Sequence, residues 1–354
     1  MSAIVERRWD TDAFVVALVV NRAGTCAAAA LGDGSVWLID LGAPDASPQV
    51  IQAHEGACLA LARDSDDESF LSGGDDGRLR RIAPGAEPKT LAEVKGAWIE
   101  AVDASPHSRL RAYAARRQVF LLDDAGQPWR HALEHPSTVS GLAFAPNGKR
   151  LAVAHYGGAT LWWTGQAGGP TRLDWAGSHL GVLWHPEGTH LMTSLQEPGL
   201  HGWRLKDKAD MQMSGYSTKV RSLGWTRRAR YLVTAGGDAI VCWPFFGGGP
   251  WEKPPLELAG GPTIVVTAVA PHPTEDVVMA GHRDGLVLVA PLDGGQPVTL
   301  AEPEQSPVSA LAWSPNGRHL LFGTEAGRLS WFLFFGTSPS NSAGKSTRRD
   351  RPAI

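Results

Sequence analysis

The sequence predicts an all-β fold in which repeated units of short strands close into a ring. Three observations support this prediction. Residues 140–163 align with 309–332 without a gap, residues 66–79 align with 316–329, and no stretch has a long helical period with capping residues. Equivalent apolar positions recur at intervals of 40–46 residues, at Leu18, Leu61, Val102, Leu142, Val182, Leu223, Val269 and Leu311. The chain therefore contains eight units.

Each unit has the pattern of four short antiparallel strands. Apolar or alternating runs of about five residues are separated by Pro-Asn-Gly, by a Gly/Asp pair and by looser polar links. A unit of about 41 residues accommodates four such strands with tight turns, which is one blade of a β-propeller. We therefore predict a closed β-propeller of eight four-stranded antiparallel blades, or of seven if the weak third unit, residues 102–119, is irregular.

The two ends of the chain are expected to meet in one blade. The eighth unit ends at residues 329–335 without an outer strand, and residues 4–9 precede the first unit. An N-terminal strand that closes the last blade would remove an exposed sheet edge. We predict a single propeller domain over residues 1–335 and a disordered polar and basic tail over residues 336–354.

Composition narrows the classes of function. The chain has 354 residues, 43% of them hydrophobic, and a formal net charge of −3, which offers no basic field for nucleic acid. Three scattered cysteines exclude a disulfide framework, and the apolar runs are too short to span a bilayer. We expect a cytoplasmic, monomeric protein that binds neither nucleic acid nor membranes. The excess of Arg (25) over Lys (8) hints at a bacterial source.

The repeats resemble the WD40-repeat family of β-propellers over residues 4–335. The likeness lies in the turns "LAFAPNG" and "LAWSPNG", in the Asp-Gly turns and in tryptophans at strand ends. In that family a link His, a strand Ser or Thr, a turn Asp and a Trp form a buried hydrogen-bonded set. The resemblance implies these structural roles for His54, Ser72, Asp76, Asp33, His135, Trp163 and Asp284. No unit has the complete set, and Ile82 stands where the second unit would have Trp.

Catalytic and metal sites are not predicted. The acidic stretch 64–77 has Ser69 where a calcium loop needs Gly and Asp75 where it needs Glu, and the strand between its two acidic clusters separates them by about 20 Å. His179 and His185 belong at opposite ends of a strand, and the Gly-Lys-Ser of the tail lacks the earlier Gly of a phosphate loop. We expect no metal, no cofactor and no catalytic residue. The alternative is a propeller enzyme, or a small-ligand or metal binder, that uses the central channel.

One face of the predicted disc carries the candidate contacts. The resemblance implies that links between blades and turns between second and third strands line the face where partner proteins dock. Candidates on this face are Trp98, Glu100, Arg116, Tyr156, His179, Tyr216, Lys219, Arg221, Arg283, Glu325 and Asp75. Aromatic and Arg side chains dominate interface energetics. The Gly/Pro-rich insertion 244–262 adds Phe246 and Trp251, which either dock a partner or fold back and seal a blade edge. We expect a non-catalytic scaffold that binds one or more proteins.

Overall fold

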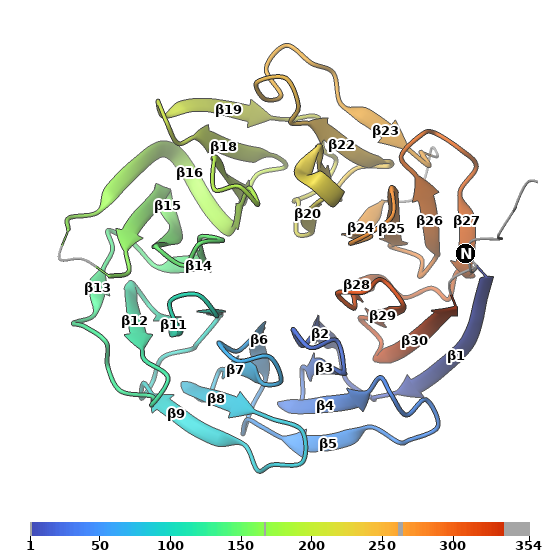
Figure 1. Ribbon diagram of the computed structural model, residues 1–354, viewed down its shortest axis with the longest axis horizontal. Helices are drawn as coiled ribbons and strands as arrows, with labels where there is room; N and C mark the ends of the chain where they lie inside the picture. Colours follow the sequence, from blue (N-terminus) through green and yellow to red (C-terminus); the bar gives the residue numbers. More distant parts are fainter. Residues whose placement is uncertain (1, 166–167, 261–264, 336–354) are drawn as a thin grey trace, which may run out of the picture.

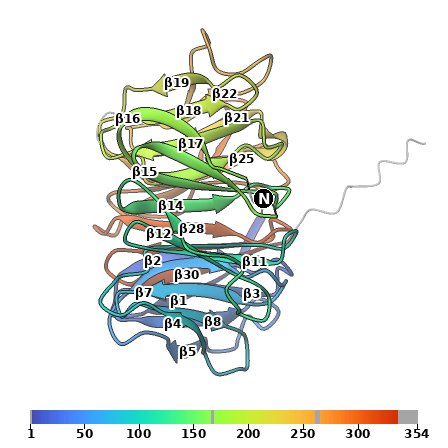
Figure 2. The same cartoon turned by 90° about the vertical axis from the view of Figure 1, so that its left-hand side faces the viewer.

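The computed structural model describes residues 2–165, 168–260 and 265–335, and arranges them as a ring of β-sheets around a central axis (Figure 1). Seen from the side, the ring is a disc whose strands run through its thickness (Figure 2). Neighbouring strands within each sheet pair antiparallel. The predicted all-β propeller is confirmed.

Six of the sheets have four strands. They are, in chain order, β2 (Val15–Val20), β3 (Cys26–Leu31), β4 (Ser35–Asp40) and β5 (Gln49–Gln52); β6 (Cys58–Arg63), β7 (Phe70–Gly74), β8 (Arg78–Ile82) and β9 (Lys89–Glu93); β10 (Ala101–Ser105), β11 (Leu110–Ala115), β12 (Gln118–Leu122) and β13 (Leu133–Glu134); β20 (Leu223–Trp225), β21 (Tyr231–Thr234), β22 (Ile240–Pro244) and β23 (Leu256–Leu258); β24 (Val266–Pro271), β25 (Val277–His282), β26 (Val287–Pro291) and β27 (Val298–Ala301); and β28 (Val308–Trp313), β29 (His319–Thr324), β30 (Arg328–Phe335) and β1 (Ser2–Asp10). A short 3₁₀ helix, η1 (Arg227–Ala229), joins β20 to β21.

A seventh sheet has six strands and contains the fourth and fifth units. It consists of β14 (Val139–Phe144), β15 (Arg150–Trp163), β16 (Thr171–Trp184), β17 (His190–Leu195), β18 (Leu200–Arg204) and β19 (Ala209–Met213). The strands β15 and β16 have 14 residues each, and β16 pairs with β15 through its first part and with β17 through its second. The prediction of eight separate four-stranded blades is therefore wrong, because the described strands form seven hydrogen-bonded sheets.

Glycines explain why these two units share a sheet. The turn position of the fourth unit holds Gly157 and Gly158 in place of Asp, and both have positive φ angles, of 91° and 136°. A Cβ at Gly158 would lie 2.1 Å from the Leu173 carbonyl oxygen, so only glycine permits the close pairing with β16. Pairing continues to Tyr156 and Ser178, where the other units have an unpaired link. The third unit, the one expected to be irregular in a seven-bladed ring, forms a four-stranded sheet of its own, with an outer strand of two residues.

The N-terminal strand closes the ring as predicted. Strand β1 pairs antiparallel with β30, from Asp10 opposite Arg328 to Ser2 opposite Phe335. Figure 1 shows β1 as the outermost strand of the blade that also holds the end of the described chain. Both termini of the ring are thus held in one sheet, and the outer edge of β30 is covered.

The core lies between adjacent blades. In β3, Ala27, Ala29 and Leu31 pack toward the last blade, whereas Ala28 and Ala30 pack toward the second. Successive side chains of a strand point to opposite faces of the sheet, so a blade buried on both faces needs apolar residues at consecutive positions. This requirement accounts for the uninterrupted apolar run "CAAAAL".

The innermost strands are joined by side chains at one repeated position, two residues after the recurring apolar residue. Arg63 Nε donates to the Val20 carbonyl at 2.6 Å, and Trp225 Nε1 donates to the Trp184 carbonyl at 2.8 Å. Equivalent bonds run from Trp184 to Ala143 and from Trp313 to Ala270, at 2.9 and 3.2 Å. Neighbouring units are thus connected around the axis although their innermost strands belong to different sheets or, for β14 and β16, are separated by β15 in one sheet.

Candidate protein-docking face

A buried hydrogen-bonded set holds the second blade to its preceding link. His54 Nδ1 lies 3.0 Å from Asp76 Oδ1, and His54 Nε2 lies 2.8 Å from Ser72 Oγ. Burial lowers the pKa of His54, so the neutral ring donates from Nδ1 to the carboxylate and accepts at Nε2 from the hydroxyl. Asp76 Oδ1 also accepts from the Arg78 amide, at 3.0 Å. The link is thereby fixed to the turn that follows β7.

The other predicted turn aspartates have the same local geometry. Asp33 Oδ1 accepts from the Ser35 amide at 2.9 Å, and Asp284 Oδ1 accepts from the Leu286 amide at 3.1 Å. A carboxylate that bonds the amide two residues later stabilises a tight turn. Gly77 follows Asp76 with a φ of +74°, and a Cβ there would lie 2.4 Å from the Val94 carbonyl. These turns therefore need both the Asp and the Gly of the repeated pattern.

Two further buried hydrogen-bonded sets, in the fourth and sixth units, differ from those predicted. In the fourth unit Trp162, not Trp163, donates from Nε1 to His135 Nε2, at 3.0 Å, so the assignment of Trp163 is wrong. The extended β15 lacks the Asp turn, which shifts the indole by one position. Trp163 instead lies under the Arg150 guanidinium, 4.2 Å from its carbon to the ring centre.

In the sixth unit Tyr216 takes the place of histidine. Its hydroxyl lies 2.8 Å from Thr234 Oγ1 and accepts from Trp243 Nε1 at 2.7 Å. His179 is fully buried, with Nδ1 2.8 Å from Thr193 Oγ1 and Nε2 3.1 Å from the Trp175 carbonyl oxygen. The prediction that His179 and Tyr216 are surface contacts is therefore wrong. Tyr216 lies seven residues before the recurring apolar residue, as His54 does, whereas His179 lies within β16 and reaches the strand threonine from there.

The acidic stretch 64–77 is divided between the two faces of the disc. Asp64 precedes β7 at one end and Asp76 follows it at the other. Asp64 is fully buried and accepts from Arg111 and Arg81, and Asp66 accepts from Arg81 at 2.9 Å. Asp64 and Asp66 are thus paired with an arginine of their own blade, and Asp64 also with an arginine of the next blade.

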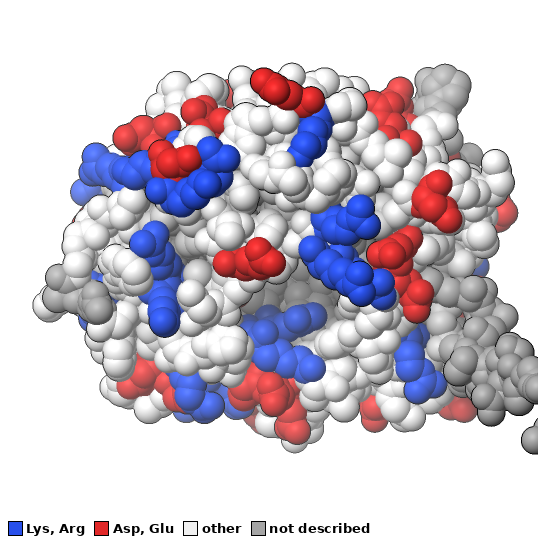
Figure 3. Space-filling model, turned by 45° about the horizontal axis from the view of Figure 1, so that its top comes forward, with Lys and Arg blue, Asp and Glu red and all other residues white. Residues whose placement is uncertain are grey.

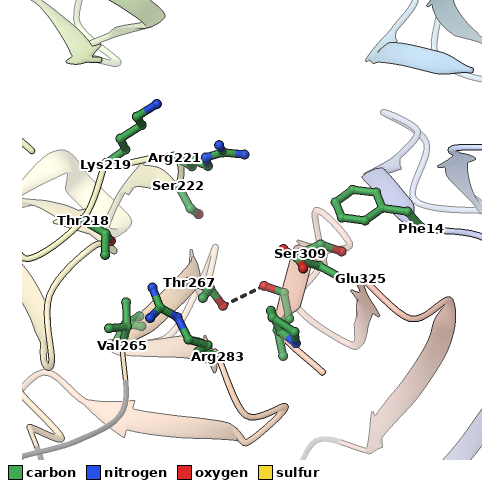
Figure 4. A pocket seen from close by; sticks show the side chains of 13 residues that line it. Phe14, Thr218, Lys219, Arg221, Ser222, Val265, Thr267, Arg283, Ser309 and Glu325 are labelled. Carbon is green, nitrogen blue, oxygen red and sulfur yellow. Dashed lines mark hydrogen bonds between the residues drawn. The ribbon is translucent and has the colours of Figure 1, made fainter. Parts of the chain in front are cut away.

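Four predicted contact residues gather around one hollow on the face that carries the links, which we call the link face. Lys219, Arg221, Arg283 and Glu325 line a cavity of about 360 Å³ together with Phe14 (Figure 4). Lys219 and Arg221 precede β20, Arg283 lies in the turn after β25, and Glu325 lies in the turn after β29. At the base of the cavity Thr267 Oγ1 donates to the Val308 carbonyl at 2.7 Å. Three cations thus lie beside one carboxylate and one aromatic ring.

Sequence reasoning missed Phe14, although a signal for it exists. Phe14 lies four residues before the recurring apolar Leu18, and Lys219 and Trp98 have the same spacing before Leu223 and Val102. Phe14 is 41% exposed. Reading this link position in every unit would have included it among the candidates.

The remaining candidates lie outside this hollow. Trp98 and Tyr156 are 61% and 65% exposed, and Glu100 and Arg116 are also exposed. Arg116 donates to the Gly96 carbonyl at 2.9 Å, and Asp75 is half-buried. These residues lie in links and turns of the second, third and fourth units, on the far side of the ring from Arg283.

The described part of the insertion, residues 244–260, folds back onto the fifth unit. Trp251 Nε1 donates to the Asp210 carbonyl at 3.2 Å, and the Arg204 guanidinium lies 4.5 Å from the centre of the Trp251 ring. The buried Phe245 ring lies edge-on to His190, with centroids 5.3 Å apart. Phe246 is 43% exposed, and Lys253 and Arg230 lie over its ring. The two roles predicted for this insertion are docking of a partner and sealing of a blade edge. The contacts of Trp251 are those expected of a segment that seals the edge.

No group of three or more His, Cys, Asp or Glu in residues 2–165, 168–260 and 265–335 is placed to hold a metal ion. Within the same ranges, no helix is long and apolar enough to cross a membrane. The predicted tail, residues 336–354, lies outside the described residues.

Comparison with known proteins assigns one stretch of the chain to a repeat family. A model of the family described as "WD domain, G-beta repeat" matches residues 46–80, the segment that contains His54, Ser72 and Asp76. This segment is a WD40 repeat, and the chain that contains it folds as a β-propeller. The propeller is 22% identical over 301 residues to autophagy-related protein 16 of Arabidopsis thaliana, covering 81% of this chain. It is 27% identical over 184 residues to an intraflagellar transport protein 122 homolog of Danio rerio, covering 52% of this chain.

These relatives are longer than the matched region. The aligned region of the propeller spans 58% of the Arabidopsis protein and 15% of the zebrafish protein. Among solved structures, the crystal structure of the computationally designed Ika8 protein superposes with a TM-score of 0.72 at 18% identity, covering 92% of this chain and 98% of that one. At this identity the likeness concerns the fold alone.

Proposed function

We propose that this WD40 propeller is a non-catalytic scaffold that binds one or more proteins in the cytoplasm, with residues 1–335 acting as one domain. The observation that carries the proposal is the cluster of Lys219, Arg221, Arg283, Glu325 and Phe14 around one hollow of the link face. These side chains come from links and turns of separate blades. A rigid ring that presents side chains from several loops at one place is suited to recognition of a partner surface.

The side chains around the hollow are suited to binding a partner protein and not to catalysis. Phe14 offers an exposed ring, the three cations offer charge-assisted hydrogen bonds, and Glu325 adds one acceptor. A partner segment that carries a carboxylate next to an apolar side chain matches this arrangement. Trp98, Glu100, Arg116, Tyr156 and Asp75 extend the proposed docking face around the ring.

The test is affinity capture from the native cell, with the bound proteins identified by mass spectrometry. We expect an Arg221→Ala, Arg283→Ala double variant to lose a partner that the wild type and an Arg109→Ala, Arg318→Ala variant retain. The control arginines are exposed and do not line the hollow. Unchanged partners in the first variant would contradict the assignment of the face, and capture of no partner by the wild type would contradict the scaffold.

A further inference from the structure

The face opposite the link face carries a second, basic surface. Four hollows lie there, lined by turns between first and second strands, such as residues 145–149 and 226–229, and by Leu205 and Lys206 between third and fourth strands. Alternate connections of an antiparallel sheet lie at opposite ends of its strands. These hollows are therefore on the other side of the disc from Lys219 and Arg283.

The four hollows adjoin one another through shared lining residues. Ala145 is common to a hollow of about 450 Å³ and one of about 360 Å³. Lys206 is common to the hollow of about 360 Å³ and a third hollow of about 500 Å³. The third hollow shares Glu187 with a fourth hollow of about 460 Å³. We call this continuous stretch the basic groove.

Charge along the basic groove is strongly one-sided. Arg22 and Arg63 line the first hollow, Lys149, Arg150 and Lys206 the second, Arg204 and Lys206 the third, and Arg227 and Arg228 the fourth. Among the described lining residues, the acidic side chains are Asp103 and Glu187. Figure 3 looks obliquely onto the face that carries η1 and shows basic side chains predominating around the central hollow, with most acidic ones nearer the edge. The chain as a whole has a net charge of −3, so this local excess is opposed by acidic residues elsewhere.

Several of these cations have no carboxylate partner within the structure. Arg204 is paired with Asp207 at 2.8 Å, but no ion pair joins Lys149, Lys206 or Arg228 to a described acidic side chain. Arg22 and Arg63 both line the first hollow, so two like charges lie together there. Burial and the neighbouring Arg22 guanidinium lower the pKa of Arg63. Juxtaposed like charges are relieved when an anionic partner binds.

We propose that the basic groove binds an acidic, extended segment of a partner protein, on a surface separate from the link face. Successive hollows suit successive side chains of an extended polypeptide, whose carboxylates would lie near Lys149, Lys206 and Arg228. Nucleic acid is disfavoured because the aromatic residues of the groove cannot stack on bases. Phe144, Trp184 and Phe245 are each less than 10% exposed, and Trp163 is covered by Arg150. The half-buried Trp225 is already packed edge-on against His185 and Phe245. The tail of this chain is also unsuited, because residues 345–351 contain four basic residues and one acidic residue.

The test is fluorescence anisotropy with a fluorescein-labelled oligo-glutamate peptide and, as a competing class, a single-stranded DNA oligonucleotide of equal charge. We expect the full chain to bind the peptide, and a Lys149→Glu, Lys206→Glu, Arg228→Glu variant to bind it about tenfold or more weakly. These three side chains are exposed, and circular dichroism melting checks that the variant is folded. Affinity should fall as salt rises, because the Debye length shortens from about 10 Å at 0.1 M to about 3 Å at 1 M.

The matched control is a Lys219→Glu, Arg221→Glu, Arg283→Glu variant, which makes the same change of charge on the link face. It should bind the peptide with nearly the wild-type affinity. Equal weakening by both variants, no binding of the peptide, or tighter binding of DNA than of the peptide would overturn the proposal. None of these outcomes alters the capture experiment above, so the two faces are tested separately.

Discussion

The carboxylate of Asp64 accepts two hydrogen bonds from the guanidinium of Arg111, from Nε at 2.6 Å and from Nη2 at 3.0 Å, across the boundary between the second and third blades. Asp64 is fully buried and Arg111 is 4% exposed. Arg81 adds a third bond to Asp64, at 3.0 Å. What the sequence presents as part of an acidic stretch is therefore a buried ion pair that holds two blades together.

Removing Asp64 should destabilise the ring strongly. We expect Asp64→Ala to lower the free energy of unfolding by about 3–5 kcal/mol, because it leaves Arg111 buried without a counter-charge. Urea denaturation followed by tryptophan fluorescence measures the loss. The control is Glu55→Ala, since Glu55 pairs with Arg78 at 2.6 Å but is 75% exposed, and should cost at most about 1 kcal/mol. Similar losses in the two variants would mean that Asp64 is not structurally important.

The repeat predicted most of this architecture because the spacing of its apolar residues and the composition of its turns have physical causes. The apolar residue recurring from Leu18 to Leu311 marks the innermost strand of each unit, and turns such as Asp33-Gly34 and Asp76-Gly77 mark the ends of second strands. The N-terminal strand was predicted because β30 would otherwise expose an edge. Each of these signals is local in sequence or follows from edge protection.

Other features depend on contacts that the sequence does not display. The shared six-stranded sheet arises because backbone pairing continues through Gly158 to Ser178, and a count of units cannot show whether adjacent units remain hydrogen-bonded. Tyr216 takes the histidine role through a hydroxyl that reaches Thr234, which a search for His overlooks. The residues that line the hollow of the link face include Phe14 and residues more than 200 positions later in the chain. The sequence can therefore suggest these residues singly but not as a group.

The indole of Trp225 should contribute to cohesion between blades. Trp225→Phe keeps the aromatic packing but removes the Nε1 donor that the Trp184 carbonyl accepts at 2.8 Å. A buried carbonyl without a partner costs about 1–3 kcal/mol, and we expect a loss of that size in thermal or urea unfolding. Trp98→Phe is the control, because Trp98 is 61% exposed, and its stability should match the wild type. A wild-type melting curve for Trp225→Phe would show that this bond adds nothing.

Acid should destabilise the protein below about pH 6.5. Burial lowers the pKa of nine histidines, among them His135, His190 and His201, whose pKa values fall to about 4; the others are His54, His179, His185, His272, His282 and His319. Below the unfolded pKa of about 6.5, the unfolded chain takes up protons that the folded protein excludes. Stability is therefore complete above about pH 6.5 and falls as the pH drops toward 4.

His201 offers a test of this pH dependence. The ring is fully buried and stacks on Trp175 with centroids 3.9 Å apart. We expect His201→Phe to reduce the slope of unfolding free energy against pH between about 6 and 4, by up to about 1.4 kcal/mol per pH unit. The exposed His107 serves as the control, and His107→Gln should leave the slope unchanged. Parallel pH profiles for His201→Phe and the wild type would refute this assignment.

The insertion 244–262 should stabilise the fifth unit through Trp251. Trp251→Ala removes the bond to the Asp210 carbonyl and the stacking of Arg204, and it uncovers β19 at the edge of the sheet. We expect a loss of about 1–3 kcal/mol and faster proteolytic cleavage within the insertion, because its anchor on the fifth unit is gone.

Phe246→Ala is the matched control for Trp251→Ala, since it truncates an aromatic ring in the same insertion. Phe246 is 43% exposed, and its neighbours Lys253 and Arg230 belong to the sixth unit or to the insertion itself. It should therefore cost about 0.5 kcal/mol and leave the cleavage rate near that of the wild type. If instead Phe246→Ala were the more damaging change, the anchor would be the sixth unit, and the insertion would not seal the edge of β19.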